Sequence, residues 1–158
     1  MTMPPAQAED VSVPEIVNSR WFAAPPEHGL GAFRDPALLA RWWGPAGFTN
    51  TVPEFDFRPG GHWRIVMRAP DGTEYPNESE FLEIVPGKFI AFLHLGPMHR
   101  YWLRMTYAAE NHGTRLTWHM RFATATEHAK VKDFVLAANE ENFDRLAAVL
   151  SETTTARR

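Results

Sequence analysis

Four polar side chains fall on faces of the chain that are otherwise apolar, and these groups are the best placed for chemistry. The amides of Asn77 and Asn142 and the hydroxyl groups of Tyr75 and Tyr101 share their faces with aromatic and aliphatic residues. A buried polar group needs a hydrogen-bond partner, which a bound ligand or a water molecule can supply. These residues indicate either a site that binds a small molecule or satisfied polar groups in a packed core.

Proton transfer would need a titratable group close to this set. His99 shares the strand parity of Tyr101, and these two residues, together with Glu74 and Glu141, are the candidates for an acid or a base. A single histidine more often forms a hydrogen bond to a neighbouring backbone group. The catalytic residues, and whether the protein is an enzyme, therefore stay open on the sequence.

Other kinds of site lack their motifs. The seven histidines show no close pairing of the kind that binds a metal, and the absence of cysteine excludes disulfides, thiolate metal sites and a cysteine nucleophile. The sequence contains no P-loop, no dinucleotide-binding glycine motif and no Gly-x-Ser-x-Gly motif. We therefore expect neither a metal nor a cofactor.

The composition is typical of one folded domain. A chain of 158 residues that is 44% apolar and 13% aromatic can bury one substantial core, so we expect a single domain over residues 11–152 with tails at 1–10 and 153–158. The formal net charge of −3 argues against a nucleic-acid partner. Because the sequence shows neither a membrane-spanning apolar run nor a signal peptide, we expect a cytoplasmic protein without a membrane span.

The first part of the chain predicts a strand followed by two short helices. Residues 12–22 form the strand, and residues 26–33 form a short helix that Gly29 and Gly31 weaken. A second helix begins at the Asp35-Pro36 pair, which supplies an N-cap acceptor and a proline at the first helical position. Because Trp42 and Trp43 are adjacent, we expect one of them to face the core and the other to lie at a cavity entrance or in a subunit contact.

From Thr49 to Phe122 the apolar residues alternate with period two between turn signals, which predicts six antiparallel strands. Thr124 and Glu127 then form a capping box at the start of a long helix that runs to about Glu152 and carries a wide apolar stripe. This stripe must lie against the apolar face of the sheet. The sequence therefore predicts an α+β fold in which a curved seven-stranded antiparallel sheet wraps around the long C-terminal helix.

A long helix on a strongly curved sheet seldom packs flush along its whole length, so we predict an elongated apolar cavity between the two. The same side chains would equally serve to fill a packed core. The candidates for ligand binding are the inward-facing residues of the strands and of the helix: Trp63, Met67, Tyr75, Asn77, Phe81, Tyr101, Leu103, Met105, Trp118, Met120, Phe134, Ala138 and Asn142.

Four motifs in sequence carry a resemblance to a known family. They are ARWWGP at 40–45, FDFRPGGHWR at 55–64, PDGTEY at 70–75 and DRLA at 144–147. In this order they resemble the proteins similar to the C-terminal domain of the heat-shock protein 90 ATPase activator, in the START-like (SRPBCC) superfamily, over about residues 20–150. The resemblance implies a helix-grip fold like that of the birch-pollen allergen, but no particular reaction, because relatives include lipid carriers, hormone receptors and aromatic cyclases. The chain departs from the usual pattern at Gly29 and Gly31, where a more apolar first helix is common.

Three functions are compatible with these features. The first is a protein that binds a hydrophobic small molecule, either aromatic or lipid-like, in an internal hydrophobic cavity. The second is an enzyme of the cyclase, dehydratase or hydrolase type that uses the same cavity. The third is an interaction protein that contacts a chaperone, as an ATPase activator would, or a second copy of itself in a homodimer. We expect the first function, because it requires only the cavity.

Overall fold

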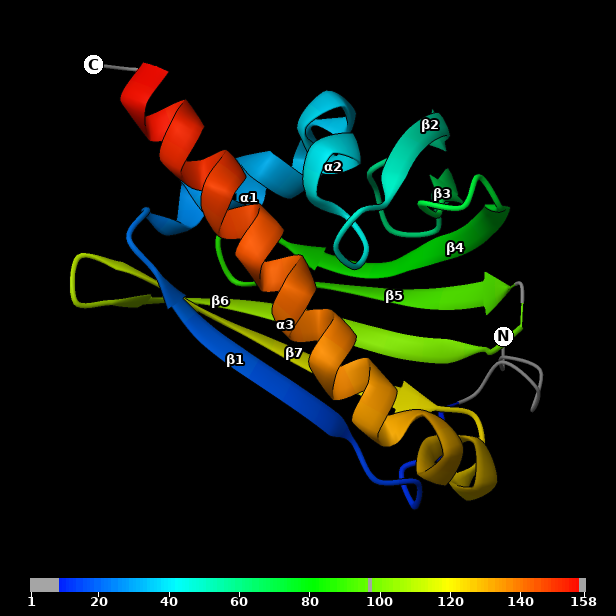
Figure 1. Cartoon of the computed structure of the whole chain (residues 1–158). Coiled ribbons are helices and arrows are strands. Elements are labelled where there is room, and N and C mark those ends of the chain that lie inside the picture. Colours follow the sequence, from blue (N-terminus) through cyan, green and yellow to red (C-terminus); the bar gives the residue numbers. More distant parts are fainter. Residues whose placement is uncertain (1–8, 97, 157–158) are drawn as a thin grey trace.

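The computed structural model describes residues 9–96 and 98–156. Its seven strands form one antiparallel sheet in the order β1-β7-β6-β5-β4-β3-β2, so the strands from β2 to β7 form a meander and β1 pairs with β7 (Figure 1). The elements in chain order are β1 (Ile16–Phe22), α1 (Pro26–Arg34), α2 (Pro36–Trp42), β2 (Thr49–Phe55), β3 (His62–Arg68), β4 (Glu74–Val85), β5 (Phe89–Gly96), β6 (Tyr101–Glu110), β7 (Gly113–Phe122) and α3 (Ala125–Ala156).

This arrangement confirms the predicted fold class and is consistent with the helix-grip fold. The first strand begins at Ile16 rather than at residue 12, and α3 continues to Ala156, beyond the predicted end at Glu152 and into the predicted C-terminal tail. Residues 1–8 of the predicted N-terminal tail, and residues 157–158, lie outside the described residues. No described helix combines the length and the hydropathy that a membrane span requires.

The helix starts follow the predicted capping residues. The side chain of Asp35 accepts a hydrogen bond from the backbone N–H of Ala37 at 3.0 Å, with Pro36 in the first helical position of α2. The hydroxyl oxygen of Thr124 accepts from the backbone N–H of Glu127 at 3.1 Å. Both contacts satisfy N–H groups that the first turn of a helix leaves without an internal partner.

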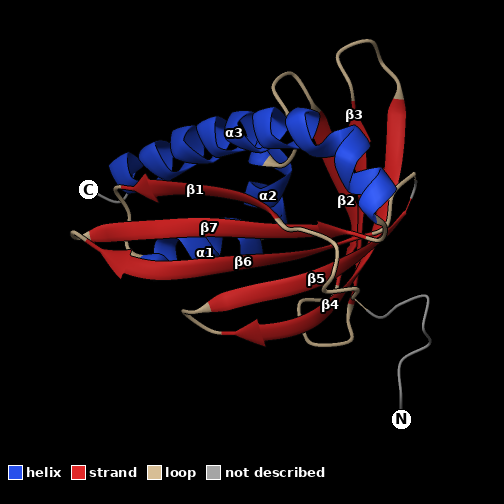
Figure 2. Cartoon of the chain, turned by 90° about the horizontal axis from the view of Figure 1, so that it is seen from below, coloured by secondary structure: helices blue, strands red, loops and turns tan. Residues whose placement is uncertain are grey.

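Irregular pairing curves the sheet toward α3. The register shifts between Thr51 and Glu54 in β2 and at two places in β4. Such bulges bend a strand and increase its twist, and Pro53 lies within the first of them, on an edge strand where the missing N–H is tolerated. The sheet thereby gains a concave face that α3 crosses (Figures 1 and 2).

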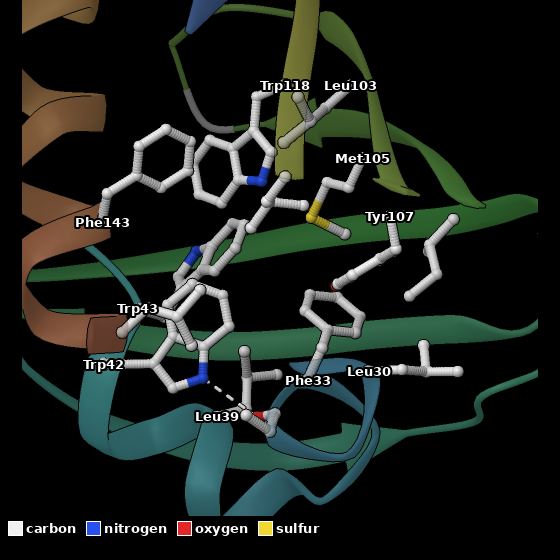
Figure 3. Close-up of a cluster of buried hydrophobic side chains, with 14 of the residues drawn as sticks. Leu30, Phe33, Leu39, Trp42, Trp43, Leu103, Met105, Tyr107, Trp118 and Phe143 are labelled. Atoms are coloured by element: carbon white, nitrogen blue, oxygen red, sulfur yellow. Dashed lines mark hydrogen bonds between the residues drawn. The ribbon is translucent and has the colours of Figure 1, made fainter. Parts of the chain in front are cut away.

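An aromatic core fills the space between the sheet, α1, α2 and the C-terminal half of α3 (residues 139–156), as Figure 3 shows. Phe33 is fully buried and its ring makes an edge contact with Trp63 at a centroid distance of 5.4 Å. The indole of Trp42 donates to the carbonyl of Ala32 at 2.9 Å. Phe143 from α3 completes the cluster against Trp118 at 4.9 Å. This end of the molecule is a sealed core.

The tryptophan pair departs from the prediction, because both residues face the core. Trp42 is 1% exposed and Trp43 is 7% exposed. The helix α2 ends at Trp42, and Trp43 takes an extended backbone conformation, so the two side chains do not follow helical spacing. The ring of Trp43 instead contacts Trp63 at 5.1 Å and Trp118 at 5.5 Å. The expectation that only one of the pair faces the core is therefore wrong, and Trp43 also lines one of the cavities described below.

Candidate functional site

The N-terminal half of α3 (residues 125–138) lies over the sheet without a buried residue of its own, in contrast to the half that follows. Beneath it are two hollows that share walls, which we call the outer pocket, with a volume of about 560 Å³, and the inner pocket, with a volume of about 130 Å³. The residues common to both linings are Pro45, Met67, Asn77, His94, Tyr101, Met120, Ala138 and Asn139.

Most of the candidate ligand-binding residues line one of these pockets. The outer pocket includes Met67, Tyr75, Asn77, Tyr101, Met120, Phe134 and Ala138. The inner pocket adds Trp63, Leu103, Trp118 and Asn142. The remaining two candidates, Phe81 and Met105, are completely buried and belong to the packed core rather than to either lining.

The opening of the outer pocket exposes large apolar side chains. Phe134 is 72% exposed, Met98 is 82% exposed and Tyr75 is 36% exposed. The sequence pattern places Phe134 in the buried stripe of α3, but here the helix stands away from the sheet and its apolar face meets the pocket and solvent. A contiguous exposed apolar surface on a small protein commonly marks a place where another molecule binds.

At the bottom of the pockets His94 is held by two hydrogen-bond contacts. Its Nδ1 lies 2.8 Å from the backbone carbonyl oxygen of His99, and its Nε2 lies 2.7 Å from Oδ1 of Asn77. The amide nitrogen of Asn77 donates in turn to the carbonyl of Tyr75 at 2.7 Å. Burial lowers the pKa of His94, because the charged form loses its hydration.

Tyr101 lies directly against this histidine. The two rings are nearly parallel, with centroids 4.5 Å apart. Burial raises the pKa of Tyr101, so at neutral pH its hydroxyl group keeps its proton and is a hydrogen-bond donor. Among the described residues this hydroxyl has no hydrogen-bond partner, and it is therefore able to donate to a molecule in the pocket.

Asn142 lines the inner pocket, yet its polar atoms are already paired. Its amide nitrogen donates to the carbonyl of Trp42 at 2.7 Å, and its oxygen accepts from the backbone N–H of Gly44 at 3.2 Å. Both contacts hold the turn that follows α2 against α3. Asn142 therefore acts as a structural clamp at the inner end of the site.

Arg145 also holds the turn that follows α2 against α3, and it connects two of the sequence motifs. Its guanidinium donates to the backbone carbonyls of Trp43, Gly44 and Pro45 from Nη1 and to those of Arg41 and Phe48 from Nη2, at 2.7 to 3.0 Å. The loop carbonyls thus replace water around this side chain. The arginine in the DRLA motif ties the WWGP turn to α3 and fixes the wall between the core and the inner pocket.

A polar seam holds the middle of α3 to the edge strand β1. The amide of Asn139 donates to Oδ1 of Asn18 at 3.0 Å, and Asn18 donates to the side chain of Glu140 at 2.8 Å. Arg20 forms ion pairs with Glu140 at 2.8 Å and with Asp144 at 2.7 Å. The hydrogen bond from Arg20 lowers the pKa of Glu140. This seam sets the position of the helix above the pockets.

The candidates for an acid or a base are dispersed. His99 and Tyr101 line the outer pocket, and His99 lies 3.4 Å from the carboxylate of Glu127. Glu74 and Glu141 are exposed and belong to neither lining, and Glu141 accepts from the backbone N–H of Ala46 at 3.1 Å. The structure therefore brings only two of the four candidates together.

Several lining residues were missed as candidates from the sequence. His94 lies in a strand that is buried on both faces, so no alternation of apolar and polar residues marks it. The usable signal was that His94 shares its face of the strand with the buried Ile90 and Phe92. Asn139 follows the apolar stripe of α3 and is only 8% exposed. The other lining residues outside the candidate sets are Trp43, Gly44, Pro45, Phe48, Ile65, Ser79, Phe92, Met98, Phe122, Lys130, Val131 and Val135.

Comparison with known proteins gives a family and a set of similar structures. The model of the family described as "Activator of Hsp90 ATPase homolog 1-like protein" matches residues 23–151. A crystal structure from Chromobacterium violaceum is 28% identical, with a TM-score of 0.77, and the alignment covers 86% of this chain and 96% of that one. A crystal structure from Mycobacterium smegmatis is 26% identical, with a TM-score of 0.80 and coverage of 92% and 96%. No curated protein matches the chain significantly.

Proposed function

We propose that this chain, which belongs to the Activator of Hsp90 ATPase homolog 1-like family, binds an elongated apolar small molecule in the outer and inner pockets. The proposal rests on the contrast between the apolar opening of this site and its polar, buried bottom. Large apolar side chains are exposed at the opening, as Phe134 and Met98 show, whereas a polar group, His94, is buried at the bottom. Apolar walls with a few convergent polar groups are the usual form of a small-molecule site.

The dimensions support a ligand of moderate size. The outer pocket, at about 560 Å³, lies within the range of roughly 300 to 1,000 Å³ that is typical of ligand pockets. Its walls come from the loops around Pro45 and Met98, from the strands and from α3. Burial of a ligand there would also cover Phe134, which adds a hydrophobic contribution of about 25 cal/mol per Å² of apolar surface removed from water.

The pair Ala138→Trp and Ala137→Trp tests this proposal. Ala138 lines both pockets, whereas its neighbour Ala137 is exposed on the other face of the same helix. Each substitution adds the same indole to α3, but only the first fills the space under the helix. The measurement is a fluorescence titration with N-phenyl-1-naphthylamine, an uncharged apolar probe whose emission rises on burial.

We expect Ala138→Trp to weaken probe binding by at least about tenfold, which corresponds to about 1.4 kcal/mol, and Ala137→Trp to leave it within about twofold. Unfolding curves of both variants show whether the fold is kept. Equal binding by the two variants, or no saturable binding by the unaltered protein, would contradict the proposal.

The finer parts of the sequence interpretation stay predictions. They are the cytoplasmic location, the homodimer, the chaperone contact and the use of the pocket for catalysis. The burial of Trp42 and Trp43 removes an exposed tryptophan from the predicted subunit contact.

A further inference from the structure

The hydrogen-bond chain through His94 contains one proton too few when the imidazole is neutral. The chain runs from the carbonyl oxygen of His99 through His94 and Asn77 to the carbonyl oxygen of Tyr75. Backbone carbonyls only accept, so Nδ1 of His94 must donate at one end and the amide nitrogen of Asn77 must donate at the other. This leaves Oδ1 of Asn77, an acceptor, facing Nε2 of His94, which must therefore also donate.

Reversing the Asn77 amide does not remove the mismatch. The amide nitrogen would then face Nε2 of His94 at 2.7 Å, but the amide oxygen would face the carbonyl oxygen of Tyr75 at a similar distance. A neutral imidazole has one N–H, and the chain is fully satisfied only when His94 carries two. The geometry thus favours an imidazolium at a place where burial opposes the charge.

The surroundings of His94 supply no counter-ion. The titratable residues in the two linings are Tyr75, His94, His99, Tyr101 and Lys130, and the described lining contains no Asp or Glu. On the packing elements, the carboxylate of Glu127 on α3 pairs with His99 at 3.4 Å, and that of Glu78 on β4 pairs with Arg64 at 3.8 Å. The strands beside His94 present Ser79 from β4 and Tyr101 from β6, which are both neutral.

We propose, on the basis of the function proposed above, that the ligand is an apolar molecule with an anionic group, and that His94 takes up one proton when this ligand binds. The anion supplies the missing counter-charge, and Nε2–H then donates to Oδ1 of Asn77. Tyr101, whose ring centroid lies 4.5 Å from that of His94, donates to the anion from its hydroxyl group. Lys130 in the outer lining carries a further positive charge toward the opening. The proton comes from solvent or from the acid form of the ligand, and no covalent bond changes.

Two fluorescent probes that differ in charge test this inference. 1-Anilinonaphthalene-8-sulfonate has the ring system of N-phenyl-1-naphthylamine with one added sulfonate. We expect the affinity for the sulfonate to rise as pH falls from about 8 to about 5.5, by up to about tenfold per pH unit, because one proton is taken up with the anion. The affinity for the uncharged probe should stay within about twofold over the same range. Calorimetry in buffers of different ionisation enthalpy gives the number of protons taken up.

Two variants assign the effect to His94. The substitution His94→Gln keeps a side-chain donor but cannot take up a proton, and His99→Gln removes the other histidine of the lining as a matched control. We expect the first to abolish proton uptake and the second to leave it. Asn77→Asp places a carboxylate against Nε2, so it supplies the counter-charge before any ligand binds and should weaken sulfonate binding by about tenfold.

The outcomes separate this inference from the general proposal. If both probes bind with equal affinity and without proton uptake, the anion inference is wrong and the apolar site stands. Proton uptake that persists in His94→Gln would also overturn the inference. If neither probe responds to Ala138→Trp, the site itself is wrong.

Discussion

The two halves of α3 lie on the same sheet but differ in how they pack against it. The C-terminal half buries Phe143, Leu146, Val149 and Leu150 in the aromatic core, each at 5% exposure or less. The N-terminal half buries none of its residues and leaves Phe134 largely exposed over the outer pocket. One amphipathic helix thus closes the core at one end and forms the roof of a site at the other. The difference shows that an apolar stripe on a helix does not by itself indicate a core.

The largest expected effect contrasts two phenylalanines on this helix. Phe143→Ala should lower the free energy of unfolding by about 3 to 5 kcal/mol, because it leaves a cavity beside Trp118 and Phe22. Phe134→Ala should lower it by less than about 0.5 kcal/mol, because this side chain is mostly exposed. Urea unfolding measures both. Similar losses in the two variants would show that the N-terminal half is packed in solution.

A second prediction concerns Arg145, which holds the turn after α2 against α3 at the boundary between the two halves of the helix. Arg145→Met keeps much of the side-chain volume but removes a donor from five backbone carbonyls. Of these, the carbonyl of Trp43 keeps the amide of Asn50 and that of Pro45 keeps the backbone N–H of Phe48. We expect a loss of about 2 to 3 kcal/mol in urea unfolding, because buried acceptors without partners are destabilising. Asp144→Met on the exposed side is the neighbouring control, although it also removes one ion pair with Arg20. A loss no greater than that of the control would remove Arg145 from this role.

Asn142→Leu tests a second contact between α3 and the turn that follows α2. The variant removes a donor to Trp42 and an acceptor for Gly44, so we expect a loss of stability of about 1 to 3 kcal/mol. Ala148→Leu, on the exposed face of α3, serves as the control and should change stability by less than about 0.5 kcal/mol. Unaltered stability with changed probe affinity would return Asn142 to the list of ligand-binding residues.

The smallest expected effect is the pH dependence of the empty protein. The pKa of His94 is lowered in the folded state. Between this lowered pKa and the ordinary value of about 6.5, the unfolded chain therefore binds a proton that the folded chain does not. The contribution of His94 to stability is therefore present above this pH and declines as the pH falls through the range between the two pKa values. Thermal unfolding of the protein and of His94→Gln over this range measures it. An identical slope in the variant would exclude His94 as the cause.

Much of the fold was predictable, because local signals agree with it. The Asp35-Pro36 start, the Thr124 cap and the alternation between Thr49 and Phe122 each reflect a short-range physical constraint, and the structure confirms the elements they predict. The failure at Trp42 and Trp43 came from extending helical spacing one residue beyond the end of α2. Helix ends depend on tertiary contacts, here those of Asn142 and Arg145, which lie about 100 residues away in the chain.

The site was less accessible to sequence reasoning. Parity along the strands identified the faces that carry Met67, Tyr101 and Met120, but it could not separate a pocket wall from a core position such as Met105. That distinction depends on how far α3 stands from the sheet, which the seam between Asn18 and Asn139 sets. Hydrogen-bond partners across such distances leave no periodic signal in the sequence.

The most direct test of the ligand site is a titration of the methyl-labelled protein with N-phenyl-1-naphthylamine, followed by NMR. We expect saturable chemical-shift changes at the methyl groups of Val131, Val135 and Ala138, in the N-terminal half of α3. The methyl groups of Leu146 and Val149, in the sealed half, should change little. Changes of equal size in both sets, or the absence of saturable change at Ala138, would contradict the claim that the two halves of this helix serve different roles.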